Sequence, residues 1–555
     1  MLQPSKYKFP FVLLAVLDGW GISERKDGNA IALAHTPNFD KYWSTFPHSQ
    51  LGASGESVGL PRGEVGNTET GHLNLGAGRI VYQDLARINM SIADGSFFSN
   101  EVLNNAIDHA MTHNSKLHFM GLVGAGGVHS NIEHLYALIQ LASRKQFNNV
   151  FIHVFTDGRD SSPRSAMTYI SQLQEVMKRE NVGQIASVMG RYWAMDRDQR
   201  WDRTAKAYFA LTRGEGARVR SVQEAVETSY NEGKTDEFIE PALITGRDNV
   251  PIALIQDNDA VVFFNFRIDR PRQLSRAFVL ENIQVTNQDW GFDPYAVKYE
   301  KKHEPAIELP PVVIHRGEKL KNLYFVMMTE YGKFLAQGGA HAAFPPELVT
   351  MPLGQVLSIN NLHQLRAAES EKERFVTYYF NGQVEKPFAL EDRLIVPSPD
   401  IATYDLKPEM SAHELTKQII TKMQSSQDYS FVLVNFANAD MVGHTGNLQE
   451  AIKAVEHVDQ CLGELFNTVN MMGGAMIITA DHGNAESMVH KDTGNAETEH
   501  TASMVPFIVL SEKFVGKYQT LQSGILADVA PTTLALLGVD KPSQMMGRNL
   551  LAELI

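Results

Sequence analysis

The chain has 555 residues, of which 43% are hydrophobic and 21% charged, as is typical of a soluble globular protein with two or more domain cores. Its formal net charge of -14 argues against broad binding to nucleic acid or to an anionic membrane, but leaves room for a local basic pocket. The one cysteine, Cys461, excludes an internal disulfide framework and is typical of a reducing compartment. We therefore expect a cytoplasmic protein with no membrane or nucleic-acid partner.

The first apolar run, Phe11 to Leu17, follows Lys6 and Lys8 and ends on Asp18-Gly19. Lysines before a short apolar run occur in signal peptides, but this run is only marginally long and lacks a small-residue cleavage site. We favour the alternative, a first buried strand that brings Asp18 to the end of a sheet. No apolar stretch approaches the roughly 20 residues needed to span a bilayer.

A glycine-rich loop, Leu51 to Arg79, follows this strand and carries two candidate nucleophiles. Within Asn67-Thr68-Glu69-Thr70-Gly71-His72 a hydroxyl precedes a helix-like turn, where backbone N–H groups and the helix dipole favour a phosphate. Thr68 is the first candidate and Thr70 is its rival, whereas the structural alternative makes Thr68 a simple helix N-cap. Spacing alone does not separate these interpretations.

Strand and helix patterns then alternate from about Tyr82 to Val326, which indicates βαβ units and a mostly parallel sheet. The segment from Ile283 to Leu320 breaks this rhythm with four prolines, so we expect an insertion there. A loop rich in Gly and Ala, Gly338 to Ala343, is a candidate hinge. The predicted strands are Leu117 to Val123, Val150 to Phe155, Ile185 to Met189, Val261 to Phe266 and Asn322 to Thr329, and the predicted helices are Ile132 to Arg144 and Ser162 to Glu180, the second starting at Ser161 or Ser162 with Pro163.

Arginines concentrate directly after the strands of this middle segment, and His129 follows another of them. Side chains at strand ends point toward a crevice, and guanidinium groups bind phosphate and carboxylate in bidentate fashion. The alternative is surface pairing, because each cluster carries its own aspartates. For three clusters at corresponding positions we favour a small-anion pocket. The residues are Arg159, Asp160, Arg191, Arg197, Arg267 and Arg270.

Acids and imidazoles follow two apolar runs in the last third of the chain. The run from Ala475 to Thr479 leads to Asp481-His482, and the run from Ser430 to Phe436 leads to Asp440 and His444. Asp440 and His444 are four residues apart, so both side chains can lie on one face of a helical turn. A buried Asp–His hydrogen bond is a common structural feature, and each pair alone proves little.

His500, just before the strand-like Met504 to Leu510, completes a set of three aspartates and three histidines that includes Asp18. Oxygen and nitrogen ligands without a thiolate suit Mn²⁺, Mg²⁺ or Zn²⁺. Six or seven ligands fit two ions better than one, and paired ions are a standard device for phosphoryl transfer. Such a pair needs a hydroxyl nucleophile, a role that Thr68 can fill.

Asp18 lies near the N-terminus and the other metal-type ligands near the C-terminus, so the middle of the chain must be a domain inserted into another. We predict an α/β fold with a discontinuous metal-binding domain at residues 1–81 and 345–555. A second α/β domain at residues 82–344 would bind the substrate and carry the insertion at about 283–320.

These residues resemble the cofactor-independent (2,3-bisphosphoglycerate-independent) phosphoglycerate mutases of the alkaline phosphatase superfamily, almost from end to end. The matching motifs are Leu17 to Gly21, Gly66 to Arg79, Gly126 to Ser130, Asp157 to Asp160, Gly190 to Asp198, Phe266 to Gln273, Glu369 to Lys372, Asp440 to His444, Asp481 to Glu486 and His500-Thr501. The resemblance implies an alkaline-phosphatase-like doubly wound sheet interrupted by a transferase domain, with the active site between them. Hinge loops at Arg79 to Gln83 and Gly338 to Phe344 would allow the domains to close.

The resemblance also implies the ligands of two divalent ions, for which Mn²⁺ is our first choice and Mg²⁺ or Co²⁺ the alternatives, with no 2,3-bisphosphoglycerate. One ion would be held by Asp440, His444 and His500, and the other by Asp18, Asp481, His482 and Thr68. The substrate, 3-phosphoglycerate or 2-phosphoglycerate, would contact His129, Arg159, Asp160, Arg191, Arg197, Arg267, Arg270 and Lys372. The family suggests a monomeric glycolytic and gluconeogenic enzyme.

Three roles follow for the reaction that the resemblance implies. Thr68 would attack phosphorus and carry the phosphoryl group, and Lys372 would stabilise the departing alkoxide. Asp160 would deprotonate the hydroxyl of glycerate that recaptures the phosphoryl group.

The chain departs from the family pattern at three places. The family nucleophile is a serine where this chain has Thr68, whose extra methyl group stiffens χ1 and crowds in-line attack. The family motif S-D-G-G-V-H-S-H here has Ala125 and Asn131 in place of an acid and a histidine. The segment from Ile283 to Leu320 is longer than in compact members. These departures leave two alternatives open, a metal-dependent phosphohydrolase or phosphopentomutase of the same superfamily, and a weakly active homologue that binds phosphate and metal.

Overall fold

The computed structural model describes residues 8–283, 314–425, 429–517 and 521–552. The chain divides into two compact units, which we describe separately. Unit 1 contains residues 1–83 and 348–555, and unit 2 contains residues 84–347. The expected breaks were after residues 81 and 344. Most of the expected insertion, residues 284–313, lies outside the described residues.

Unit 1 is built on an eight-stranded sheet of order β12-β11-β13-β1-β14-β15-β2-β16. Its strands are β1 (Val12–Leu17), β2 (His48–Gly52), β11 (His363–Glu369), β12 (Glu391–Val396), β13 (Tyr429–Phe436), β14 (Ala475–Thr479), β15 (Val505–Leu510) and β16 (Gly524–Ile525). Strand β1 pairs in parallel with β13 and β14, β11 pairs in parallel with β12 and β13, and β15 is antiparallel to its neighbours β14 and β2.

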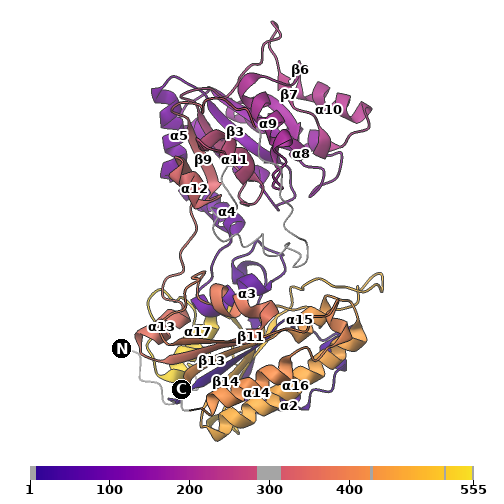
Figure 1. The fold of residues 1–555 in the computed structure, drawn as a ribbon, viewed down its shortest axis with the longest axis vertical. Coiled ribbons are helices and arrows are strands. Elements are labelled where there is room, and N and C mark those ends of the chain that lie inside the picture. Colours follow the sequence, from indigo (N-terminus) through magenta and orange to yellow (C-terminus); the bar gives the residue numbers. More distant parts are fainter. Residues whose placement is uncertain (1–7, 284–313, 426–428, 518–520, 553–555) are drawn as a thin grey trace. The chain divides into compact units, whose positions relative to one another are not determined.

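Strand β1 is fully buried at the centre of this sheet, because its sequence VLLAVL is apolar on both faces, as in a parallel strand that is covered on both sides. The run from Phe11 to Leu17 therefore contains a core strand, which confirms the favoured interpretation of that run as a buried strand rather than a signal peptide. Helices α2 (Pro37–Thr45), α14 (Ala412–Met423) and α16 (Leu448–Met471) lie together on one face of the sheet, and α3 (Thr68–Ala77), α13 (Leu353–Ile359) and α17 (Val529–Leu537) lie on the other (Figure 1).

Unit 2 is built on a second eight-stranded sheet, of order β10-β9-β8-β3-β4-β5-β7-β6, in which only β7 runs antiparallel to its neighbour β5 (Figure 1). The strands are β3 (Leu117–Val123), β4 (Val150–Thr156), β5 (Gln184–Gly190), β6 (Ala217–Val219), β7 (Ala242–Ile244), β8 (Ala260–Phe263), β9 (Tyr324–Thr329) and β10 (Ala340–Phe344). The helices are α4 (Asp84–Asp94), α5 (Glu101–Thr112), α6 (Ile132–Arg144), α7 (Ala166–Glu180), α8 (Arg191–Ala194), α9 (Trp201–Arg213), α10 (Val222–Asn231), α11 (Pro271–Val279) and α12 (Lys333–Gln337). The α/β fold class and the parallel sheets are confirmed.

Three local predictions were wrong. Helix α7 starts at Ala166 rather than Ser162, because the side chain of Asp236 accepts hydrogen bonds from the backbone N–H groups of Ser165 and Ala166, at 2.8 and 2.9 Å. That carboxylate is distant in sequence, so the start signal could not be read locally. Residues 340–344, expected in a hinge loop, form β10, which pairs in parallel with β9.

The third wrong prediction is the glycine-rich loop from Leu51 to Arg79, which contains the end of β2 and the whole ten-residue helix α3. Its glycines allow close packing. A Cβ on Gly66 would lie 2.1 Å from the Ala53 carbonyl oxygen, and one on Gly76 would lie 1.9 Å from the Phe380 carbonyl oxygen. Glycine content therefore reflects how closely this segment packs on its neighbours.

A chain of buried polar groups crosses the core of unit 2. His118 on β3 and His153 on β4 are fully buried, and His118 Nδ1 lies 3.0 Å from His153 Nε2. Asp259 Oδ2 lies 3.1 Å from His118 Nε2, and Ser187 Oγ lies 2.8 Å from His153 Nδ1.

Among the described residues, no helix of either unit combines the length and the apolar character needed to cross a bilayer.

Candidate metal centre and anion site

Four neighbouring parallel strands of unit 1, β11, β13, β1 and β14, end at the same edge of the sheet. The predicted side chains follow these ends: Lys372 lies three residues after β11, Asp440 four residues after β13, Asp18 directly after β1, and Asp481 two residues after β14. This is the crevice in which open α/β sheets collect their functional groups. The residues that the sequence placed at strand ends therefore meet in one cluster.

Asp440, His444 and His500 converge on one point. Asp440 Oδ1 lies 3.2 Å from Nε2 of each histidine, and the two Nε2 atoms are 3.0 Å apart. The opposite ring nitrogens lie 2.7 Å from the Thr498 carbonyl oxygen (His444 Nδ1) and 3.0 Å from the Gly66 carbonyl oxygen (His500 Nδ1). Because carbonyl oxygens accept only, both Nδ1 atoms carry protons, and in the neutral rings two lone pairs and a carboxylate oxygen face one another. A cation resolves that arrangement, so these residues fit a metal ion.

Asp18, Asp481, His482 and Thr68 form the adjoining part of the cluster. Thr68 Oγ1 lies 2.9 Å from His482 Nε2 and 3.4 Å from Asp18 Oδ1, and His482 Nε2 lies 3.3 Å from the same Asp18 oxygen. Asp481 Oδ2 is fully buried and lies 3.2 Å from His72 Nδ1 and 3.7 Å from His482 Nε2. Buried carboxylates and an imidazole that meet in this way are typical ligands of a divalent cation.

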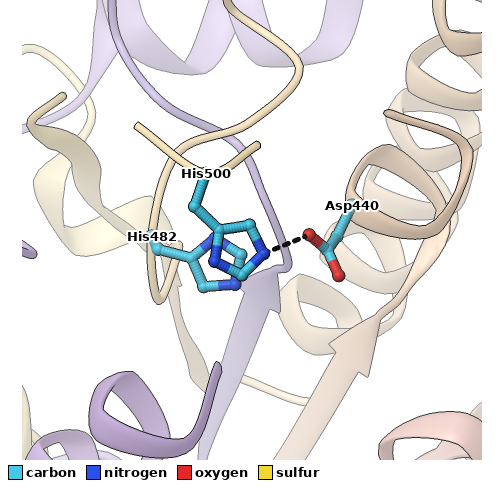
Figure 2. Close-up of side chains that lie close together, drawn as sticks. All are labelled: Asp440, His482 and His500. Carbon is cyan, nitrogen blue, oxygen red and sulfur yellow. Dashed lines mark ion pairs between the residues drawn. The ribbon is translucent and has the colours of Figure 1, made fainter. Parts of the chain in front are cut away.

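All six predicted acid and imidazole ligands are thus close together, and which of them share an ion stays a prediction. Asp440, His482 and His500 form one set whose ligand atoms lie within 4.8 Å of one another, and Asp18, His72 and Asp481 form another. Figure 2 shows the His482 ring stacked on the His500 ring, with centroids 3.9 Å apart, and Asp440 facing His500. His72 was not predicted as a member of the cluster.

The two threonines of the candidate nucleophile segment have different roles. Asn67, not Thr68, is the N-cap of α3, since its side chain accepts from the backbone N–H of Thr70 at 2.9 Å. Thr70 Oγ1 donates back to Asn67, at 3.2 Å. The N-cap alternative for Thr68 is therefore wrong, and of the two hydroxyls it is that of Thr68 which lies among the metal-type ligands.

Lys372 is the cation of this cluster. Its Nζ donates to Asp18 Oδ1 at 2.8 Å, to Asp440 Oδ2 at 2.7 Å and to Thr68 Oγ1 at 3.2 Å, and the residue is 3% exposed. Burial lowers the pKa of this amine, but the Asp18 and Asp440 carboxylates more than offset it, so the pKa lies above its ordinary value. Lys372 is therefore held protonated beside the candidate nucleophile.

Glu486 is a member of the surroundings that the sequence did not single out. Its Oε2 accepts from the backbone N–H groups of Gly21 and Asn484, at 3.1 and 2.8 Å, and its Oε1 accepts from the Thr501 hydroxyl. One buried carboxylate thus ties the loop after β1 to the loop after β14. The only local signal for this role was its place in the Asp481 to Glu486 motif.

In unit 2 the predicted substrate residues also follow neighbouring parallel strands, here β8, β3, β4 and β5. The residues that follow these strand ends are Arg267 and Arg270 after β8, His129 after β3, Arg159 and Asp160 after β4, and Arg191 and Arg197 after β5. The arrangement repeats that of unit 1 with a different set of side chains.

Aspartates pair with part of this arginine set. Arg191 Nη1 donates to Asp157 Oδ1 at 2.6 Å and to Asp160 Oδ2 at 2.5 Å. Arg197 Nη1 donates to Asp269 Oδ2 at 2.6 Å, and Arg267 Nε donates to Asp269 Oδ1 at 3.2 Å. The pairing alternative is thus partly correct.

Positive charge nevertheless dominates the centre of the set. Burial lowers the pKa of Arg270 to about 10, with a further contribution from the neighbouring guanidinium groups of Arg191 and Arg197. Burial also lowers the pKa of His129 to about 3, which the Asp269 carboxylate partly offsets and the Arg191 guanidinium reinforces. Burial disfavours charge of either sign, but the contributions of the guanidinium groups to both pKa values favour an anion.

Arg159 and Asn131 have surroundings that differ from those of the other residues in this set. The Arg159 side chain is 56% exposed, with its Nη1 3.9 Å from Glu237 Oε1, so it is more accessible to solvent than the other arginines of the set. Asn131, which stands where the family has a histidine, is the N-cap of α6 and accepts from the backbone N–H of Glu133 at 2.9 Å. A helix cap therefore accounts for that departure structurally.

In comparisons with known proteins, a different family model matches each of the two units. A family model described as the N-terminus of BPG-independent PGAM matches residues 88–333, and one described as type I phosphodiesterase / nucleotide pyrophosphatase matches residues 361–511. The chain is 48% identical over 539 residues to a 2,3-bisphosphoglycerate-independent phosphoglycerate mutase of Clostridium novyi, covering 97% of this chain and 99% of the relative.

A protein of the same name from Moorella thermoacetica is 47% identical over 542 residues, with 98% of each chain covered. Among solved structures, the phosphoglycerate mutase of Leishmania mexicana at low cobalt concentration matches with a TM-score of 0.58 and 28% identity, covering 99% of both chains.

Proposed function

The chain belongs to the 2,3-bisphosphoglycerate-independent phosphoglycerate mutase family, and from that premise we propose that it interconverts 3-phosphoglycerate and 2-phosphoglycerate through a phosphorylated Thr68. The observation that carries the proposal is the position of Thr68 Oγ1, 2.9 Å from His482 Nε2 and 3.2 Å from Lys372 Nζ, within the cluster of metal-type ligands. The enzyme is an isomerase, in keeping with the names of its relatives.

The donor set supports two divalent ions, Mn²⁺ first, with Mg²⁺ or Co²⁺ as alternatives. Asp440, His444 and His500 would hold one ion, and Asp18, Asp481, His482 and Thr68 the other; the contacts of His482 with both parts of the cluster place it where the two ligand sets meet. When bound, the ions lower the pKa of a coordinated hydroxyl and neutralise charge on a transferring phosphoryl group.

The first transfer makes Thr68 the phosphate carrier. Its Oγ1 attacks phosphorus in line, the ester bond to glycerate breaks, and the Lys372 ammonium stabilises the alkoxide that departs. Lys372 is suited to this because the surrounding carboxylates keep it charged, and because its Nζ is already within 3.2 Å of Thr68 Oγ1.

The second transfer returns the phosphoryl group to the other hydroxyl of glycerate. The arginines of unit 2 and His129 would bind the carboxylate of glycerate, and Asp160 would remove the hydroxyl proton. The Asp160 side chain is 20% exposed, and its Oδ2 accepts from Arg191 Nη1, so it is oriented and still accessible. Two in-line displacements retain configuration at phosphorus. The mechanism requires the arginines of unit 2 and the hydroxyl of unit 1 to act on the same substrate molecule.

The proposal is tested by coupling the reaction to enolase with Mn²⁺ present and no 2,3-bisphosphoglycerate. We expect turnover that disappears with a chelator, returns with Mn²⁺ and does not respond to added 2,3-bisphosphoglycerate. Release of inorganic phosphate without formation of 2-phosphoglycerate would instead identify a phosphohydrolase. Mn²⁺ binding without turnover, also with Mg²⁺ and Co²⁺, would identify a homologue that only binds metal and phosphate.

A further inference from the structure

His72 lies four residues after Thr68 on α3, is fully buried, and contacts three parts of the metal cluster. Its Nδ1 lies 3.0 Å from the Thr68 carbonyl oxygen and 3.2 Å from Asp481 Oδ2. Its Nε2 lies 3.1 Å from Nδ2 of Asn435, a fully buried residue near the end of β13. The same Asn435 nitrogen donates to Asp18 Oδ2 at 2.8 Å.

These contacts fix the orientation of each group in the chain. An amide nitrogen donates only, so Asn435 must turn its Nδ2 to Asp18, because the opposite orientation would place the amide oxygen against a carboxylate. His72 Nε2 must then accept from Asn435, which leaves the ring proton on Nδ1 for the Thr68 carbonyl oxygen. No other tautomer satisfies both contacts of His72.

The two oxygens of the Asp18 carboxylate therefore have different partners. Its Oδ2 is occupied by Asn435, so its Oδ1 is the oxygen that faces Thr68 Oγ1, His482 Nε2 and Lys372 Nζ. The same imidazole ties the first turn of α3, which carries Thr68, to β13. The hydroxyl and the ligand oxygen are thus aimed at one another by two residues that do not themselves react.

We propose that His72 and Asn435 are a positioning pair, which orients the Thr68 hydroxyl and presents Asp18 to the metal ion of that half of the cluster. The inference rests on the proposed metal-dependent function. It differs from a role for His72 as a ligand, because both of its ring nitrogens are already committed, one to the Thr68 carbonyl oxygen and one to Asn435. Groups that orient metal ligands in this way typically change metal affinity or activity 10- to 100-fold when removed.

The test titrates the full-length apoenzyme with Mn²⁺ by calorimetry, and measures kcat and KM for 3-phosphoglycerate in parallel. His72→Gln keeps an acceptor for Asn435 but removes the Nδ1 donor, and Asn435→Ala removes the tie to Asp18. We expect each to weaken one of two Mn²⁺ sites at least about tenfold and to lower kcat, with KM unchanged within about twofold. The double variant should cost less than the product of the single effects, since both act through one chain of hydrogen bonds.

A matched control separates positioning from packing. His134 of unit 2 is also a fully buried histidine held by one amide, with its Nε2 2.9 Å from Asn89 Oδ1. His134→Gln should lower the thermal midpoint without altering Mn²⁺ affinity.

His72→Asn, which places a donor near the Nδ1 position, should restore part of the activity lost in His72→Gln.

Two results would overturn the proposed positioning pair. Unchanged Mn²⁺ affinity and unchanged kcat in Asn435→Ala would overturn it, and this test does not depend on whether His72→Gln folds. Loss of a site in both His72 variants with none in Asn435→Ala would make His72 a ligand. If the unmodified enzyme bound no Mn²⁺, the proposed function itself would be wrong. Two normal Mn²⁺ sites in the unmodified enzyme and in every variant would instead contradict only the positioning pair.

Discussion

The two units place their functional side chains in the same way and differ in which side chains they place. Each has an eight-stranded sheet in which four adjacent parallel strands end at one edge, β11-β13-β1-β14 in unit 1 and β8-β3-β4-β5 in unit 2. Unit 1 follows these strands with carboxylates, imidazoles and one lysine, whereas unit 2 follows them with arginines and a few aspartates. The sheet therefore supplies the position, and the residues after each strand decide which charged groups gather there.

Two histidines show how far the environments diverge. Burial alone would lower the pKa of His482 in unit 1, but the carboxylates of Asp481, Asp18 and Asp440 more than offset this and raise the pKa to about 10. The pKa of His129 in unit 2 falls to about 3, because burial acts together with nearby guanidinium groups. The same side chain at the same kind of position thus attracts positive charge in one unit and disfavours it in the other.

The largest effect should come from removing the group on which unit 1 depends. We expect Thr68→Ala to lower kcat in the enolase-coupled assay at least about 10³-fold, because no hydroxyl is left to carry the phosphoryl group. Mn²⁺ binding should persist, since the acid and imidazole ligands are intact. Acid quenching with labelled 3-phosphoglycerate should trap a phosphoprotein in the unmodified enzyme and none in this variant.

Thr70→Ala is the matched control for that variant, since it removes a hydroxyl from the same turn that donates to Asn67 rather than facing the metal cluster. Its kcat should stay within about a factor of ten of the unmodified value, because only a helix-capping contact is lost. Normal turnover in Thr68→Ala would remove the covalent step from the mechanism.

The second largest effect should come from a change in unit 2, and it should alter KM rather than kcat. Arg270→Ala should raise KM for 3-phosphoglycerate about 10- to 100-fold, the size expected for one charged hydrogen bond worth roughly 1.5–3 kcal/mol. Its Mn²⁺ affinity should be unchanged, because the proposed metal ligands all belong to unit 1. Steady-state kinetics and calorimetry on the same preparation measure both quantities.

Arg200 provides the control, as its side chain is 48% exposed and pairs with Asp198 at 2.7 Å. Arg200→Ala should leave KM unchanged within about twofold, since exposed pairs contribute little. If Arg270→Ala weakened Mn²⁺ binding and left KM unaltered, the separation of roles between the two units would be wrong.

The elements that sequence predicted well are those fixed by local pattern. Leu117–Val123 and Ile132–Arg144 have the predicted bounds, because a continuous apolar run and a helical period were each bounded by clear signals. The metal-type ligands were found for a related reason. Five of the six follow a buried strand, and the parallel order of those strands brings their ends together, whereas His500 precedes the antiparallel β15.

The missed features depend on partners that are distant in sequence. The start of α7 is set by Asp236, and the loop-tying role of Glu486 by groups after β1. His72 stood beside the candidate nucleophile in the sequence, but its contact with Asn435, 363 positions away, is visible only once β13 is paired with β1. Which of the ligands share an ion could not be assigned by spacing either, since His482 contacts both parts of the cluster.

The third prediction uses the buried imidazoles of unit 2. Burial lowers the pKa of both His118 and His153, although the Asp259 carboxylate partly offsets this for His118. Below an unfolded-state pKa of about 6.5 the unfolded chain binds protons that the folded core refuses, so stability falls as the pH decreases. The slope is about 1.4 kcal/mol per pH unit for each histidine. In a hydrogen-exchange measurement the protection factors, which correct for the slower intrinsic exchange of amides at lower pH, should therefore fall in β3 and β4 between pH 7 and pH 5.

The double variant His118→Gln/His153→Gln should flatten that pH dependence, whatever its stability at pH 7. Replacing the exposed His113 on the same unit should leave it unaltered. An equal fall of the protection factors in the double variant would show that other groups control the acid response of unit 2.

The smallest effect should come from returning Thr68 to the serine of the family. Thr68→Ser keeps the hydroxyl beside His482 and Lys372 and removes only a methyl group. Relief of a rotamer restriction worth roughly 0.5–1.5 kcal/mol would raise kcat about two- to tenfold, and if Thr68 already sits in its preferred rotamer, kcat would stay unchanged. In neither case should KM move, because the arginines proposed to bind the carboxylate of the substrate are unaltered. Near-complete loss of activity in Thr68→Ser would mean that the methyl group itself holds the hydroxyl in line, and that threonine is required in this chain.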